Sequence, residues 1–127
     1  MSTIKVGTLL AADGSTTTQP SIPALDQRMA KAWVDFNGTG TVAIRGSYNV
    51  SSITDNSTGN YSVNFATNMA NTNYATVTNG ARLNNQYIST HYGNQQVSKV
   101  IIVTYTINST GGADTDTVAI VVMGGQA

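Results

Sequence analysis

The alternation of apolar and polar residues along this chain predicts short β-strands joined by turns. In residues 61–65 apolar side chains recur at every second position, with Ser and Asn between them. A period of two places one kind of side chain on each face of a strand. Residues 33–36 and 42–44 are apolar stretches on either side of an Asn-Gly-Thr-Gly sequence, which is typical of tight turns between antiparallel strands.

The strand that begins at residue 42 is predicted to continue on one face through Tyr48 and Ser52. Ile53 interrupts this alternation, which indicates a bulge or a bend near the end of the strand. Residues 55–60 combine Asp, Asn, Ser, Thr and Gly, so they form the second predicted turn.

The second half of the chain predicts further strands at residues 74–77, 97–107 and 117–123. Within the last two, residues 100–103 and 118–122 are continuous apolar runs. Such runs indicate strands that are covered on both faces. They fit the central strands of a sandwich, or strands with one face in a subunit interface.

Residues 79–96 are rich in Asn and Tyr and show no clear period, so we predict an exposed contact loop there. Its candidate contact residues are Arg82, Tyr87, His91 and Tyr92.

Residues 1–30 are predicted to form an extended N-terminal arm, the alternative being a flexible tail. A brief alternation around residues 4–8 predicts a short strand, and residues 11–14 (Ala-Ala-Asp-Gly) predict a turn. The arm is expected to contact a neighbouring subunit or a shell. The candidate contact residues are Ile4, Val6, Leu9, Leu10, Pro20 and Ile22.

A short helix is predicted at the end of the arm, over residues 24–32. Leu25, Met29 and Ala32 follow one another at spacings of four and three, which gives a narrow apolar face. Pro23 suits the first turn of such a helix.

Composition agrees with an all-β fold. Thr, Asn, Ser and Gly dominate the polar positions of the 127 residues, and the chain contains no Glu. Thr favours strands, whereas Asn and Gly favour turns. We predict a single antiparallel β-sandwich or jelly-roll-like domain over residues 31–127, preceded by the arm.

Charge gives no sign of nucleic acid or membrane as a partner. Six basic and six acidic residues are scattered along the chain. A nucleic-acid binder clusters its Lys and Arg residues, and a spanning helix needs roughly 20 apolar residues in a row. The N-terminus also lacks the pattern of a signal peptide.

Catalytic and metal-binding patterns are weak. His91 is the single histidine and there is no cysteine, so neither a triad nor a zinc site is predicted. Asp114, Asp116 and residues 55–60 offer oxygens for calcium, but we favour turn capping by these aspartates. The six Asp residues do not exclude a glycosidase pair. We expect no enzymatic activity and no cofactor.

Several short segments of the chain have a familiar pattern, namely residues 1–6, 11–14, 22–23, 31–34, 36–40, 49–55 and 122–124. In these segments the chain resembles virion structural proteins of tailed phages, especially those that infect cyanobacteria. Ser57 and Asn60 stand where the family pattern often has Gly and Asp, and residues 82–96 match nothing in it.

The resemblance implies an oligomeric component of the virion. We expect a capsid decoration (cement) protein, a homotrimer assembled in the host cytoplasm, which binds the major capsid protein on the outer surface of the head. A tail fibre or receptor-binding protein that contacts glycans is the alternative. A stand-alone carbohydrate-binding module is a candidate from another class, and Tyr92 would then contact the sugar.

Overall fold

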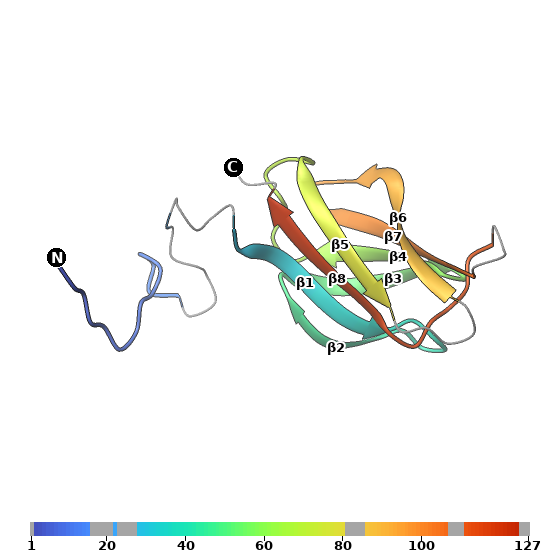
Figure 1. Ribbon diagram of the computed structural model, residues 1–127, viewed down its shortest axis with the longest axis horizontal. Coiled ribbons are helices and arrows are strands. Elements are labelled where there is room, and N and C mark those ends of the chain that lie inside the picture. The colour runs from blue at the N-terminus through green and yellow to red at the C-terminus, as the bar shows by residue number, and fades with distance from the viewer. Residues whose placement is uncertain (1, 16–21, 23–27, 81–85, 107–110, 125–127) are drawn as a thin grey trace.

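The computed structural model describes residues 2–15, 22, 28–80, 86–106 and 111–124, without the side chains of 86–93 and 106. These residues form two four-stranded antiparallel sheets, ordered β2-β1-β8-β5 and β3-β4-β7-β6 (Figure 1). The strands are β1 (Ala30–Asn37), β2 (Ala43–Tyr48), β3 (Val50–Ser57), β4 (Asn60–Phe65), β5 (Tyr74–Gly80), β6 (Gln86–Gln95), β7 (Lys99–Thr106) and β8 (Val118–Gly124). The predicted all-β sandwich is confirmed.

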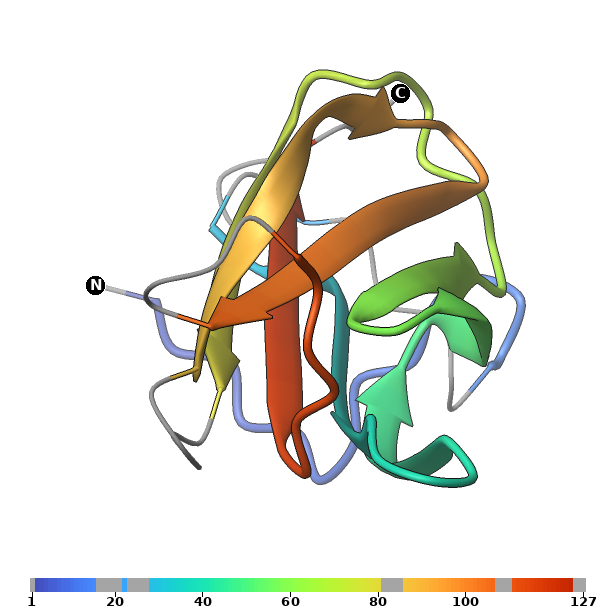
Figure 2. The same ribbon diagram turned by 90° about the vertical axis from the view of Figure 1, so that its right-hand side faces the viewer.

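The two sheets pack face to face around an apolar core, as the end view in Figure 2 shows. Alternating side chains of β1, β4, β7 and β8 fill this core, which follows from the period of two in their sequences. Phe36 and Tyr61 meet edge to face, with ring centroids 5.3 Å apart, and Phe65 and Tyr74 do the same at 5.9 Å. These aromatic pairs join strands of opposite sheets.

The helix predicted over residues 24–32 is wrong at its C-terminal end, and residues 24–27 lie outside the described part. Ala30 already belongs to β1, and Ala32 is fully buried opposite Val122. Ala32 and Val34 are therefore successive inward-facing residues of β1. Burial against β8 outweighs the helix propensity of alanine.

The continuous strand predicted from residue 42 to Ser52 is also wrong. It divides at Asn49, whose φ of 52° turns the chain out of β2 and into β3 of the other sheet. Asn tolerates this left-handed conformation better than most residues. The predicted irregularity near Ile53 is present, as shifts of register on either side of it. The second turn is shorter than predicted, because β3 continues to Ser57.

The loop predicted over residues 79–96 is wrong for residues 86–95, which form β6 and pair with β7 at the edge of the second sheet. Residues 81–85 lie outside the described part. The abundance of Asn was misleading here, because pairing with β7 supplies the backbone hydrogen bonds that an isolated segment lacks.

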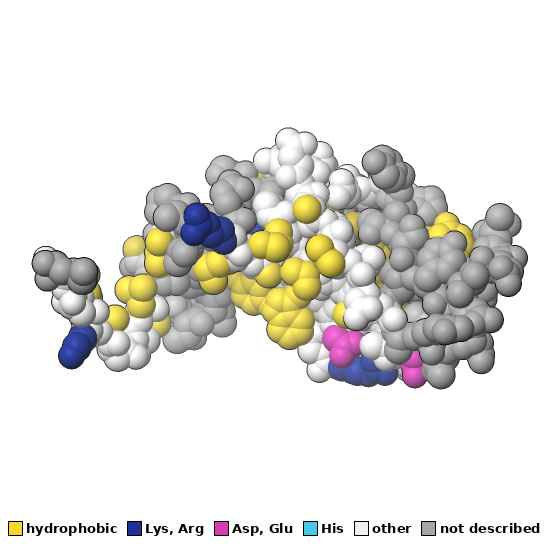
Figure 3. Space-filling view, viewed as in Figure 1, with side chains coloured by type: hydrophobic (Ala, Val, Ile, Leu, Met, Phe, Trp, Pro, Cys, Tyr) yellow, Lys and Arg dark blue, Asp and Glu magenta, His cyan; other side chains and the backbone are white. Residues whose placement is uncertain are grey.

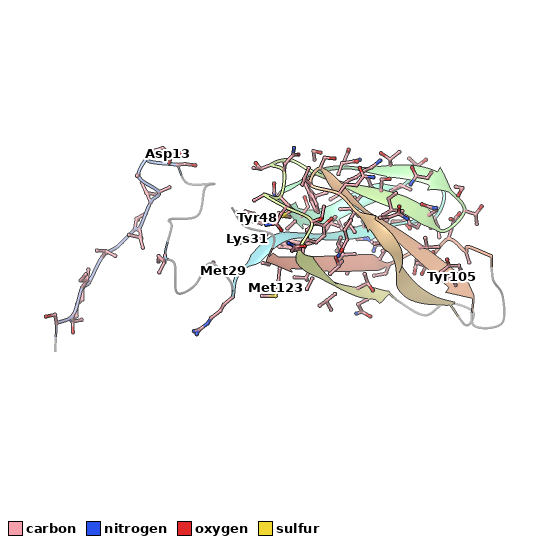
Figure 4. All side chains as sticks on the ribbon, turned by 90° about the horizontal axis from the view of Figure 1, so that it is seen from above. Asp13, Met29, Lys31, Tyr48, Tyr105 and Met123 are labelled. Atoms are coloured by element: carbon pink, nitrogen blue, oxygen red, sulfur yellow. The ribbon has the colours of Figure 1, made fainter. Side chains whose placement is uncertain are left out.

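The arm extends away from the sandwich (Figures 1 and 4). Its predicted turn is confirmed, since the Gly14 amide donates to the Ala11 carbonyl oxygen at 2.8 Å and the Ser15 amide donates to Asp13 Oδ1 at 2.8 Å. The short strand predicted around residues 4–8 is absent from described residues 2–15. No neighbouring strand pairs with this segment, and a strand needs such a partner.

Candidate functional site

Four large apolar side chains form a row across the outer face of the first sheet. Tyr48 lies opposite Trp33, Trp33 opposite Val121, and Val121 opposite Val77. We call this row the apolar stripe. Its residues are 39% (Tyr48), 41% (Trp33), 37% (Val121) and 63% (Val77) exposed. Figure 3 shows apolar side chains gathered on this face of the sandwich.

The stripe arises because the outward positions of neighbouring strands fall in register. In β1 the outward Trp33 lies between the buried Ala32 and Val34, and in β8 the outward Val121 lies between two buried residues. Sheets with one solvent-facing side normally place polar residues at such positions. A group of large apolar residues at such positions is a candidate contact surface.

One end of the sheet extends the apolar surface toward the arm. Met123 lies opposite both Ala30 and Ala75, and Met29 precedes β1 with 41% of its surface exposed. Figure 4 shows Met29, Met123 and Tyr48 at the end of the sandwich from which the arm departs. The arm and the stripe therefore adjoin the same end of the domain.

A charged group borders the stripe on the side away from Met123. Arg45 pairs with Asp35 at 3.5 Å, and its guanidinium also donates to the Asp116 carbonyl oxygen at 2.6 Å and to Thr117 Oγ1 at 3.3 Å. Since the Arg45–Asp35 pair is exposed, it contributes little stability. The bonds from Arg45 to Asp116 and Thr117 join β2 to the segment before β8. Asp35, like Trp33, is an outward residue of β1, so this charged pair lies beside the stripe.

The outer face of the second sheet has a different character. Asn64 donates to Ser52 Oγ at 3.0 Å and to Thr54 Oγ1 at 2.9 Å, which joins β4 to β3. Asn56 donates to Asn60 Oδ1 at 3.0 Å and to Ser62 Oγ at 2.9 Å. These amides and hydroxyls satisfy one another across strands. The outer face of β3 and β4 is therefore polar, in contrast to the apolar stripe.

A buried polar cluster closes the far end of the sandwich. The Tyr61 hydroxyl lies 2.8 Å from the Gly38 carbonyl oxygen and 2.9 Å from Asp114 Oδ1, which also accepts the Gly59 amide at 2.7 Å. Burial, and then the hydrogen bond to Asp114, raise the pKa of Tyr61 above its ordinary value. The cluster holds three loops together, and Asp114 caps a turn as predicted.

The predicted arm contacts are exposed where the structure describes them. Ile4 is 87% exposed, Val6 and Leu9 are each 61% exposed, Leu10 is 43% exposed and Ile22 is 37% exposed. Pro20 lies outside the described residues. The arm thus carries apolar side chains that the single chain leaves uncovered.

The residues predicted for the contact loop are not brought together by any described contact. Tyr87, His91 and Tyr92 belong to β6, whose side chains at these positions lie outside the description, as does Arg82 entirely. Their predicted role in contacts remains a prediction.

Sequence reasoning missed the stripe as a site. Val121 belongs to an apolar run predicted to be a central strand of a sandwich or a strand with one face in a subunit interface. The single chain leaves Val121 exposed, so β8 is not covered on both faces within one chain, and the subunit interface stays a prediction. The sequence did contain a signal, because β1 and β8 carry apolar residues at both odd and even positions. Alternate residues of a strand face opposite sides, so some of these apolar residues must face outward.

The described residues contain no group of three or more His, Cys, Asp or Glu side chains placed to hold a metal ion. They also contain no helix with the length and apolar character needed to span a membrane. Comparisons of the chain with family models, curated proteins and solved structures gave no match.

Proposed function

We propose that this chain is a structural component of a tailed-phage particle, a capsid decoration protein that binds and stabilises the assembled head. The observation that carries the proposal is the apolar stripe, which crosses every strand of the first sheet. A patch of this kind gains free energy when another protein covers it. The resemblance to phage virion proteins supplies the particle in which such a surface would act.

Two buried tyrosines contribute to the stability of the sandwich. Tyr61 and Tyr74 have raised pKa values because they are buried, and their hydroxyls lie at hydrogen-bond distance from carbonyl oxygens of neighbouring loops. Such hydroxyls remain protonated and hold the backbone in place. Their arrangement serves the stability of the sandwich, which suits a protein that acts through its surface.

The proposed partners are further copies of this chain, in a homotrimer, and the major capsid protein on the outer surface of the head. A protein that binds the assembled shell but not the separate subunits shifts the equilibrium toward the shell by mass action. The added stability grows with the logarithm of the free concentration divided by Kd. Assembly would take place in the host cytoplasm.

Imaging of phage particles that contain the chain tests its location. We expect density for the sandwich at regular positions on the head. Density confined to the tail would overturn the head assignment and favour the tail-fibre alternative.

Adding the purified chain to phage particles that lack it tests whether the stripe is needed to stabilise the head. Wild-type chain should restore the heat resistance of the head, and Val77→Asp, which places a charge on the stripe, should restore much less. Thr54→Asp is the matched control, because it adds the same charge to an exposed position on the polar face of β3. Equal restoration by both variants would contradict a role for the stripe.

A further inference from the structure

Among the residues that the structure describes, two apolar surfaces are left uncovered. One is the stripe, and the other is residues 2–15, the continuous described part of the arm. Exposed apolar surface tends to be covered by protein when a complementary surface is available. Both surfaces occur in every copy of the chain, so each copy supplies what another copy needs.

We infer that the arm of one copy lies across the apolar stripe of a second copy. This inference deepens the proposed function and rests on it, since it names the contact that would join copies of the decoration protein. Its test uses the purified chain alone, so its failure is distinguishable from a failure to bind phage heads.

The spacing of the arm fits the stripe. Ile4, Val6 and Leu10 fall on one side of an extended chain, with Thr8 between the last two. Neighbouring strands lie about 4.8 Å apart, so the four residues of the stripe span about 14 Å. An extended chain rises about 3.3 Å per residue, so the segment from Ile4 to Leu10 spans about 20 Å. The arm can therefore cover the whole stripe.

The charges also fit. When Ile4 and Val6 face the sheet, Lys5 points away from it, because alternate residues of an extended chain face opposite sides. The stripe itself contains no charged residue. Contact along this line buries apolar groups without removing a charge from water, which would be costly.

The described single chain points to a second copy as the occupant. Residues 16–29 have a contour length of up to about 46 Å, which is sufficient for the arm to reach its own stripe. The arm nevertheless stays off its own sheet, with Ile4 87% exposed and Trp33 41% exposed (Figures 1 and 3). Residues 2–15 lie beyond the end of the sandwich at which β1 begins, where a neighbouring copy can meet them (Figure 1).

The contact is heterologous, because an arm on one copy meets a sheet on the next. Such head-to-tail contacts close into a ring when the rotation between copies permits it. The expected homotrimer is a ring of this kind.

Trp33 provides a direct reporter, since it is the single tryptophan of the chain and belongs to the stripe. Mass photometry and tryptophan fluorescence of the full-length chain are measured over a range of concentrations. We expect the oligomer to form as concentration rises, with Trp33 emission shifting to shorter wavelength and acrylamide quenching falling several-fold. A chain that stays monomeric with Trp33 exposed at all concentrations overturns the inference, even if it binds phage heads.

Full-length variants test the contributions of the arm and the stripe separately. The arm variant Ile4→Ser/Val6→Ser/Leu10→Ser and the face variant Val77→Thr/Val121→Thr should each remain monomeric. The matched control Thr3→Ser/Lys5→Gln changes positions on the opposite side of the same extended arm and should assemble like wild type. Assembly of the arm variant with a shielded Trp33 would show that two stripes pack on each other, and would overturn the inference.

Mixing the two variants distinguishes exchange between copies from folding back within one copy. The face variant retains an intact arm, and the arm variant retains an intact stripe. We expect equimolar mixtures to form one-to-one complexes in which the emission of the arm variant's Trp33 shifts to shorter wavelength. A mixture that contains only monomers would overturn the inference.

Discussion

Val121 and Val122 are adjacent in β8 but face opposite sides of the first sheet, Val121 being 37% exposed and Val122 fully buried. The same substitution at the two positions therefore has different consequences. Val122→Thr places a hydroxyl in the apolar core and should lower the free energy of unfolding by about 2 kcal/mol. Val121→Thr should change it by about 0.5 kcal/mol or less, as is usual at surface positions.

Urea unfolding of the two variants at a concentration where the chain is monomeric measures this difference. Similar losses at both positions would mean that the outer face of the first sheet is covered within the single chain.

The Tyr61 hydroxyl links Gly38 and Asp114 at the closed end of the sandwich. Tyr61→Phe keeps the ring in the core but leaves the Gly38 carbonyl oxygen without this partner, so stability should fall by about 1–2 kcal/mol. Tyr48→Phe is the matched control, because Tyr48 is partly exposed and water can serve its hydroxyl. We expect a change of about 0.5 kcal/mol or less for the control in denaturant unfolding. Equal effects would argue against a structural role for the Tyr61 cluster.

Gly59 and Gly40 share a left-handed backbone, with φ of 66° and 61°, but differ in the space around them. A Cβ at Gly59 would lie 2.6 Å from the Thr104 carbonyl oxygen and still closer to the Ala113 backbone, whereas Gly40 has open space. Gly40→Ala should cost about 1 kcal/mol from backbone strain alone. Gly59→Ala should cost about 3 kcal/mol or more, because backbone atoms must move.

Thermal and urea unfolding of the two glycine variants measure the steric part directly. Equal losses would show that strain in φ alone decides the cost at both turns.

Burial raises the pKa of Tyr74 to about 12 and also raises that of Tyr61. The unfolded chain loses these protons near the ordinary tyrosine pKa of about 10, so above that pH the folded state binds more protons than the unfolded state. The free energy of unfolding should therefore be independent of these groups below about pH 9 and fall as pH rises from about 10 to 12.

Equilibrium unfolding at a series of alkaline pH values measures this slope. Tyr74→Phe should flatten the slope and Tyr61→Phe should do the same, whatever their effects at neutral pH. An unchanged slope in both variants would mean that neither hydroxyl holds its proton more tightly in the folded state.

The strands with the clearest pattern were predictable from sequence. In β4, Tyr61, Val63 and Phe65 alternate with polar residues, and all three are buried as expected. The turn at residues 11–14 was also predictable, because its hydrogen bonds join residues that are close in sequence. Period and turn chemistry are local properties, so these elements needed no knowledge of the rest of the fold.

The break at Asn49 was not predictable in the same way. Its amide donates to the carbonyl oxygens of Lys31 and Thr67, each 18 residues away, and its Oδ1 accepts the Thr67 amide. These remote partners stabilise the left-handed conformation that sends the chain from one sheet to the other. β6 was missed for a related reason, because its regular structure depends on pairing with β7.

The residues of this chain were enough to specify an all-β fold, most of its core and an arm with an apolar character, since all three follow from composition and local periodicity. Which side of β1 and β8 faces the core required the tertiary structure. Both strands carry apolar residues at odd and at even positions, so by sequence either face of each strand could pack against the core. Packing of the first sheet against the second buries Ala32 and Val122 and leaves Trp33 and Val121 outside. That choice aligns four apolar residues across the sheet and creates the surface to which we assign assembly.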